Sequence, residues 1–144
     1  MQALEKSQIE RIKILVAVKT YPRISSKYFE TVCTAGFLES GKWIRLYPVT
    51  FRFLSKDKKF KKYQWIEADV VKDNKDPRPE SYKISGDIKL LHCLDTKDSW
   101  EKRKKLVLSK VYFNLDTLIN EARDIKIFTS LATFKPKRIL GFSV

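Results

Sequence analysis

The sequence predicts an α+β fold whose main element is a small antiparallel β-barrel. Five segments before residue 95 are rich in β-branched and aromatic residues, and turn-forming residues separate them. Two segments with helical spacing follow, and strand-like composition returns only near the C-terminus. An order of strands, then helices, then a strand is typical of α+β proteins rather than of doubly wound parallel sheets.

The first three strands are expected in the N-terminal part of the chain, after a short helix. Their composition is rich in Val, Ile, Thr and aromatic residues, which favour strands. Glu39, Ser40, Gly41 and Lys42 have the composition of a hairpin turn between the second and third strands, and Pro48 is expected to end the third. The expected ranges are 2–10 for the helix and 12–19, 28–38 and 43–47 for the strands.

The fourth expected strand, residues 65–72, shows the clearest alternation of apolar and acidic side chains, which places them on opposite faces. Residues 74–81, rich in Pro, Asp and Asn, are expected to form a long connection inside one domain. The fifth strand is expected at 88–94. The alternating residues of the fourth are Ile66, Ala68 and Val70 on one face, and Glu67 and Asp69 on the other.

Two helices are expected next. Asp98 and Glu101 have the spacing of a capping box, which predicts a helix from Asp98 to about Tyr112. Asn114 is expected to cap the second helix, because apolar residues then recur at helical spacing. These apolar residues are Leu115, Leu118, Ile119 and Ala122.

The last strand is expected within residues 127–144, interrupted at Pro136, and it would close the barrel. An antiparallel sheet of five or six strands in a chain of 144 residues commonly curls into a barrel. We therefore expect an OB-like or PUA-like barrel with two helices inserted before the last strand. Because 43% of the residues are hydrophobic, residues 1–144 are expected to form a single basic domain around one core.

The formal net charge of +13 is distributed unevenly along the chain. Residues 42–64 have a net charge of +7 and residues 99–144 one of +6, whereas residues 1–41 have +2 and residues 65–98 have −2. A charge excess confined to two blocks indicates a binding surface for a polyanion more than an even coat for solubility.

Several classes of protein are excluded by simple features. The longest apolar run, residues 14–18, is too short to span a membrane, and the first twelve residues lack the organisation of a signal peptide. Cys33 and Cys93 are the only cysteines, so neither a disulfide framework nor zinc-finger spacing is present. With 4 glycines, the chain has no phosphate-binding loop. We expect a cytoplasmic protein without a cofactor.

The third expected strand carries the residues that we expect to contact bases. Alternation places Trp43, Arg45 and Tyr47 on one face and Ile44 and Leu46 on the other, toward the core. Bases stack on aromatic rings and on guanidinium planes, so this row suits an unpaired strand. The alternative is that a helix covers Trp43 and Tyr47.

Basic residues downstream of this strand, and on the first expected helix, are expected to contact phosphates. Lysines bind phosphates without sequence preference, and aromatic residues interleave with the first group. The alternative is that these aromatic residues only anchor a loop whose lysines are solvated. The expected phosphate contacts are Arg52, Lys58, Lys59, Lys61 and Lys62 after the strand, and Lys102, Arg103, Lys104 and Lys105 on the helix.

Residues for catalysis are sparse. His92 is the only histidine, and alternation places it beside Leu90 and Leu94 in a partly buried position. Glu67 and Asp69 share a face and could hold a divalent cation, as in a nuclease, but they also fit the polar face of an amphipathic strand.

The sequence therefore predicts a non-catalytic accessory protein that binds nucleic acid, with DNA or RNA and single or double strand left open. An interaction module or homodimer that binds an acidic protein surface is the alternative. A metal-dependent nuclease using Glu67 and Asp69 is the third hypothesis.

Overall fold

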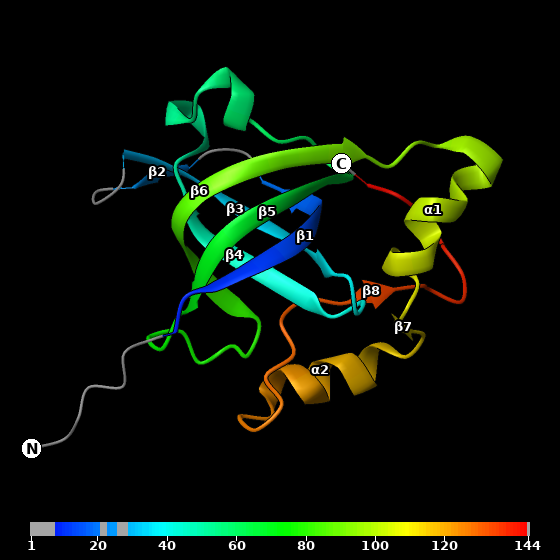
Figure 1. Ribbon diagram of the computed structural model, residues 1–144. Coiled ribbons are helices and arrows are strands. Elements are labelled where there is room, and N and C mark those ends of the chain that lie inside the picture. Colours follow the sequence, from blue (N-terminus) through cyan, green and yellow to red (C-terminus); the bar gives the residue numbers. More distant parts are fainter. Residues whose placement is uncertain (1–7, 21–22, 26–28, 144) are drawn as a thin grey trace, which may run out of the picture.

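Six strands of the computed structural model form one sheet, which closes on itself as a barrel (Figure 1). The structure describes residues 8–20, 23–25 and 29–143. The strand order is β1-β5-β6-β4-β3-β2, and a further pairing of β1 with β3 closes a barrel of five strands. The strands are β1 Glu10–Lys19, β2 Arg23–Ser25, β3 Phe29–Leu38, β4 Trp43–Val49, β5 Gln64–Lys72 and β6 Ser81–Cys93.

The predicted small α+β barrel is confirmed, but one of its pairings is parallel. Strand β6 pairs in parallel with β4, with Arg45 opposite Ser81 and Leu46 opposite Tyr82. After β4, strand β5 pairs antiparallel to β1, and β6 then pairs antiparallel to β5. Two reversals give β6 the direction of β4, so the barrel is mixed rather than wholly antiparallel.

The barrel is closed by β1 and β3, not by the last strand of the chain. Ile14 lies opposite Leu38 and Val16 opposite Gly36 in this antiparallel pairing. A Cβ atom on Gly36 would overlap the backbone carbonyl of Leu15, so the close approach requires glycine here. The prediction that residues 127–144 complete the barrel is therefore wrong, because β1 already occupies the free edge of β3.

The barrel interior contains the main hydrophobic core. The predicted alternation of β5 is confirmed, since its apolar side chains point inward and its carboxylates outward. Side chains from four strands, β1, β4, β5 and β6, and from the β4–β5 connection fill the interior, each 6% exposed or less. These are Ile14, Val16, Ile44, Leu46, Val49, Phe60, Ile66, Ala68, Val70 and Ile88.

Helix α1, Lys97–Val107, covers part of the barrel's outer face. Leu106 and Val107 at its C-terminal end pack on an outer apolar cluster centred on Leu15, Phe37 and Leu94. The half-buried aromatic residues Trp43, Tyr63 and Trp65 belong to the same cluster. The helix thus lies across strands β1, β3, β4 and β5.

The first helix is shorter than predicted and lacks the expected capping box. It ends at Val107, and its N-cap residue Thr96 makes no side-chain capping hydrogen bond. Asp98, Ser99 and Trp100 have positive φ angles, so the first turn is not regular and the Asp98–Glu101 pairing does not form. Tyr112, predicted as the last helical residue, belongs instead to the short strand β7.

The C-terminal segment forms a second, smaller layer. It contains β7 Val111–Tyr112, α2 Leu115–Arg123 and β8 Thr133–Phe134, and β7 pairs in parallel with β8. The predicted cap of α2 is confirmed, because Asn114 Oδ1 accepts from the backbone N–H of Asp116 at 2.8 Å. Among the described residues of the predicted strand at 127–144, only Thr133 and Phe134 form a strand.

Other differences from the sequence predictions involve strand ends. Pro48 does not end β4 but lies inside a bulge, where two β4 residues oppose one β3 residue. Strand β6 begins at Ser81 rather than at 88, because register shifts hide its alternation. Of the predicted helix 2–10, residues 2–7 lie outside the described residues and Glu10 begins β1.

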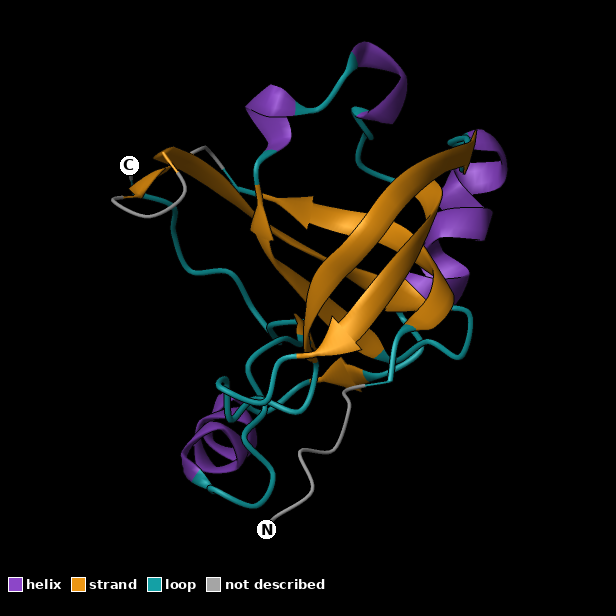
Figure 2. Cartoon of the chain, turned by 60° about the vertical axis from the view of Figure 1, so that its left-hand side comes forward, coloured by secondary structure: helices purple, strands orange, loops and turns teal. Residues whose placement is uncertain are grey.

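The helical elements occupy different sides of the barrel (Figures 1 and 2). Two 3₁₀ segments, η1 Phe51–Phe53 and η2 Lys56–Lys58, lie beyond one end of the barrel, and α2 lies beyond the other. Among the described residues, no helix combines the length and apolar character needed to cross a membrane.

Candidate nucleic-acid interface

The outer face of β4 carries the predicted base-contacting residues in different environments. Ile44 and Leu46 are buried, so Trp43, Arg45 and Tyr47 point outward as predicted. Trp43 is half-buried, because Phe37 lies against its ring, with ring centroids 4.0 Å apart. Tyr47 is 38% exposed. A helix therefore covers part of Trp43, in line with one of the alternatives, but leaves Tyr47 open.

Arg45 is held by contacts that are distant in sequence. Its Nη2 donates to Ser130 Oγ at 3.0 Å, and its backbone N–H donates to the carbonyl of Glu80 at 2.8 Å. The Ser130 hydroxyl also donates to the Glu80 carboxylate. The Arg45 Nε is buried and has no hydrogen-bond partner among the described residues. This network joins the barrel to the C-terminal segment.

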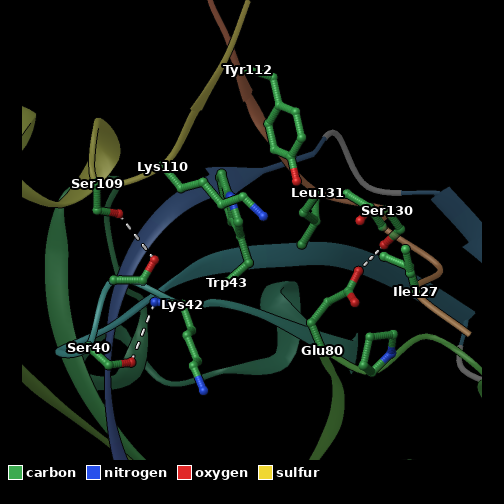
Figure 3. Close-up of a pocket in the computed structure, with 13 residues that line it drawn as sticks. Ser40, Lys42, Trp43, Glu80, Ser109, Lys110, Tyr112, Ile127, Ser130 and Leu131 are labelled. Atoms are coloured by element: carbon green, nitrogen blue, oxygen red, sulfur yellow. Dashed lines mark hydrogen bonds between the residues drawn. The ribbon is translucent and has the colours of Figure 1, made fainter. Parts of the chain in front are cut away.

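An open pocket of about 340 Å³ lies between the β3–β4 turn, the end of the β5–β6 loop and the C-terminal segment (Figure 3). Trp43 forms its barrel side, and the Lys110 ammonium lies 4.9 Å from the centroid of the Tyr112 ring, which also lines the pocket (Figure 3). Glu80 and Ser130 lie on another side of the pocket, whereas the Lys42 side chain points away (Figure 3). The remaining lining residues are Ser40, Gly41, Pro79, Ser109, Tyr112, Ile127, Thr129 and Leu131.

Hydrogen bonds hold the C-terminal wall of this pocket. Tyr112 donates its hydroxyl to Glu121 Oε2 at 2.6 Å, and Thr129 Oγ1 donates to the same oxygen at 2.9 Å. These two donors lower the pKa of Glu121. Hydrogen bonding to Tyr112 raises the pKa of Lys110, so the pocket holds a protonated ammonium at neutral pH.

The two basic blocks meet at Arg103, in the middle of α1. The Arg103 guanidinium lies over the Tyr63 ring, 4.1 Å from its centroid, and its Nε and Nη2 donate to the carbonyl of Leu94. Tyr63 directly follows Lys61 and Lys62, which are both exposed. We call Lys61, Lys62, Tyr63 and Arg103 the basic junction.

Lys19 on β1, which sequence reasoning missed, adds a further cation beside the junction. Its ammonium lies 4.0 Å from the centroid of the Phe51 ring and donates to the carbonyl of Phe60. Burial, and then repulsion from Lys62, lower its pKa. Because the Lys19 ammonium contacts Phe60, β1 places a positive charge beside the loop that carries Lys61 and Lys62.

The predicted phosphate-contacting lysines fall into two groups, those with and those without an acidic partner. Lys58 is paired with Asp87 at 2.6 Å, and Lys102 with Asp95 at 2.8 Å. Arg52 is exposed on η1. Within the described parts of the chain, the remaining lysines have no acidic partner at ion-pair distance. These are Lys59, Lys61, Lys62, Lys104 and Lys105.

The loop between β4 and β5 is anchored by some of its aromatic residues. Phe60 is 1% exposed and meets the Phe51 ring edge-on at 5.1 Å. Phe53, in contrast, is 67% exposed. The anchoring alternative therefore accounts for Phe60 but not for Phe53, which stays open beside the lysines of this loop.

The residues considered for catalysis lie on β5 and β6. His92 is exposed rather than partly buried, because it lies in a bulge where two β6 residues oppose Trp65. Arg11 pairs with Glu67 at 3.6 Å and with Asp69 at 3.2 Å, so these carboxylates form the polar face of a strand. No cluster of three or more His, Cys, Asp or Glu residues able to hold a metal ion occurs within the described residues.

Sequence reasoning also missed most of the pocket. Lys110 falls within the range predicted for the first helix but follows the helix in the structure, and Glu80 lies near the end of the predicted connection 74–81. Tyr112 and Ser130 belong to segments predicted as helix and strand ends. No local pattern marks Ser130, because its role depends on Arg45, which is 85 residues away in the sequence.

Comparison with known proteins places the barrel and α1 in one family. No curated protein and no solved structure matches the chain. A family model described as a domain of unknown function, DUF8758, matches residues 10–109. The match contains all strands from β1 to β6 and the whole of α1, and it ends just before the C-terminal wall of the pocket. The chain therefore belongs to the DUF8758 family.

Proposed function

We propose that this protein binds nucleic acid, with lysines on phosphates and aromatic residues on bases, and does not cleave it. One observation carries the proposal. The two basic blocks of the sequence, separated by a slightly acidic stretch, meet where Arg103 lies on Tyr63. Lysines that serve only solubility need not cluster on one surface, whereas a site for a polyanion requires its cations to lie close together.

The position of α1 supports a continuous path for a strand. The same outer apolar cluster includes Tyr63 at the basic junction and Trp43 at the pocket, and α1 packs across both. Lys104 and Lys105 are exposed on the helix, and Lys110 follows it. A nucleic-acid strand that runs along α1 would place its phosphates beside these cations and one base at the aromatic pocket beyond the helix's C-terminal end.

The unpaired lysines support phosphate contacts on energetic grounds. Lys59, Lys61 and Lys62 have no acidic partner among the described residues, so binding a phosphate breaks no ion pair. Lys58 would first have to leave Asp87. Each phosphate contact releases condensed counterions, so affinity should fall steeply as salt rises.

The test is a salt titration with labelled single- and double-stranded DNA and RNA. The triple variant Lys59→Ala, Lys61→Ala, Lys62→Ala should reduce the slope of log K against log salt by about 2–3, because each lost contact removes roughly 0.7–0.9. The matched control, Lys13→Ala, Lys75→Ala, Lys126→Ala, removes the same charge from exposed sites elsewhere.

Three outcomes would each contradict the proposal or a part of it. Absence of binding at low salt excludes nucleic acid as the partner. An equal change of slope in both triple variants shows that net charge, not the basic junction, governs binding. Loss of full-length strand during incubation with Mg²⁺ would show that the protein cleaves its ligand.

A second candidate, self-association, is favoured by the exposed apolar residues of the C-terminal segment. Leu115 on α2 is 54% exposed, and Leu140 and Phe142 in the tail are 85% and 94% exposed. Residues 115–124 are net acidic and residues 135–138 are basic, so α2 of one copy complements the tail of a second. Light scattering of the nucleic-acid-free protein should then give a dimer that Leu140→Asp dissociates; a wild-type monomer at high concentration excludes this candidate.

A further inference from the structure

The pocket beside Trp43 combines three kinds of chemistry within a small volume. It has an aromatic side from Trp43, a cation from Lys110 and a carboxylate from Glu80 (Figure 3). Its volume of about 340 Å³ lies at the small end of ligand pockets, which range over roughly 300–1,000 Å³. The size suits one planar ring system with a short charged group rather than a peptide segment.

The aromatic side of the pocket is set up for stacking. Phe37 lies against one side of the Trp43 indole, and the indole also lines the pocket. Ile127 and Leu131 from the C-terminal segment add apolar walls. A planar ligand between them would bury its faces on apolar surface and leave its edges for polar contacts.

The carboxylate gives the pocket a preference at the ligand's edge. One oxygen of Glu80 accepts from Ser130, and the other accepts no hydrogen bond from a described residue. A carboxylate accepts a hydrogen bond from an exocyclic amino group, such as N4 of cytosine. Uracil and thymine present the acceptor O4 at the same place, so the carboxylate would face another acceptor. The pocket should therefore favour bases that present an amino group.

Lys110 completes the site with a charge for a phosphate. Its ammonium lies over the Tyr112 ring, 4.9 Å from the centroid, and lines the same pocket as Trp43, so an anionic group attached to a ring stacked on Trp43 would share the pocket with this charge (Figure 3). Lys42 is on the adjacent turn but points away from the pocket (Figure 3). The cation inside the pocket is thus a single, defined contact rather than part of a diffuse patch.

From this arrangement we propose that the pocket binds one unpaired nucleotide whose base carries an exocyclic amino group. The base stacks on Trp43, its amino group donates to Glu80, and its phosphate pairs with Lys110. Because a base inside a duplex is stacked on both faces and is not free to stack on Trp43, the preferred partner is single-stranded. This inference rests on the proposed function and specifies the ligand of the same surface.

The test uses CMP, AMP and UMP with the full chain, followed by NMR chemical-shift changes of the Trp43 indole up to millimolar nucleotide. CMP and AMP should bind about tenfold more tightly than UMP. Glu80→Gln should remove this preference, because an amide both donates and accepts. Glu39→Gln removes a carboxylate on the exposed turn and should leave the preference unchanged.

Lys110 is tested by comparing nucleotides with nucleosides. Lys110→Met should weaken CMP binding several-fold but leave cytidine binding unchanged, whereas Lys42→Met should affect neither. In Glu80→Gln, the side-chain amide oxygen can still accept from Ser130. For every variant, an unchanged thermal unfolding midpoint shows that the fold is retained.

The outcomes separate this inference from the proposed function. Equal affinity for CMP and UMP, or a preference that survives Glu80→Gln, overturns the assignment of the ligand. Lack of mononucleotide binding alongside salt-dependent strand binding overturns the pocket inference alone. Binding of CMP without any strand binding keeps the pocket and overturns the proposed function.

Discussion

The barrel and the C-terminal segment are stabilised in different ways. Among the described residues, every fully buried hydrophobic side chain lies between Ile14 and Leu94, and α2 has no buried residue. The C-terminal segment is instead attached by hydrogen bonds, such as Thr133 Oγ1 to the carbonyl of Val107 at 2.7 Å. Regions with few buried contacts open at a lower free energy than the core. The pocket lies where these two regions meet, so its C-terminal wall is expected to open at a lower free energy than its barrel wall.

The largest expected effect comes from comparing a phenylalanine in each region. Phe60→Ala should lower the free energy of unfolding by about 3–5 kcal/mol, because it leaves a cavity in the barrel core. Phe113→Ala, at a side chain that is 67% exposed, should change it by no more than about 0.5 kcal/mol. Urea denaturation followed by circular dichroism measures both. Similar losses in the two variants would show that the regions share one core.

A pair of glycines gives the next largest difference. A Cβ atom at Gly36 would overlap the Leu15 carbonyl where the barrel closes, whereas one at Gly141 would meet nothing within 4 Å. Gly36→Ala should therefore cost about 1–3 kcal/mol, and Gly141→Ala should have no measurable effect on unfolding. The same denaturation experiment applies. An unchanged midpoint for Gly36→Ala would mean that β1 and β3 can separate without loss of stability.

The smallest expected effect is a pH dependence that belongs to the barrel. Arg78 donates to both carboxylate oxygens of Asp76, and these hydrogen bonds hold the pKa of Asp76 well below its usual range. Its stabilising effect, about 1 kcal/mol, is present above pH ~4, where an unfolded Asp is ionised, and is lost as the pH falls further. The difference in unfolding free energy between wild type and Asp76→Asn should thus shrink toward acid pH.

Glu121 provides the counterpart in the C-terminal segment. Its pKa is also lowered, by hydrogen bonds from Tyr112 and Thr129. Because these contacts lie outside the barrel, Glu121→Gln should leave the global pH profile unchanged and speed amide exchange only near the pocket wall. If Glu121→Gln changed the pH dependence of the global unfolding free energy as much as Asp76→Asn does, the two regions would unfold as one cooperative unit.

Local patterns predicted the features that depend on local physics. The alternation of β5 identified its inward side chains, and Asn114 identified the start of α2. The outward row on β4 followed from the same two-residue period. In each case a few neighbouring residues determine the outcome, so the sequence carries the information directly.

Features that depend on distant contacts could not be predicted in this way. The parallel pairing of β4 with β6 depends on where β5 lies, and the exposure of His92 depends on a bulge opposite Trp65. The pocket depends on Ser130 reaching Arg45. Alternation within one strand contains no information about register or about segments that pack later.

The closure of the barrel by β1 and β3 also affects the order of assembly during protein synthesis. All strands of the barrel precede residue 94, so the ribosome finishes the barrel before it makes the segment that contains Ser130. Domains generally fold as units, N-terminal ones first, while the ribosome synthesises the chain at about 5–20 residues per second. For a few seconds the nascent barrel would therefore present Trp43 and Arg45 without the wall that later covers them.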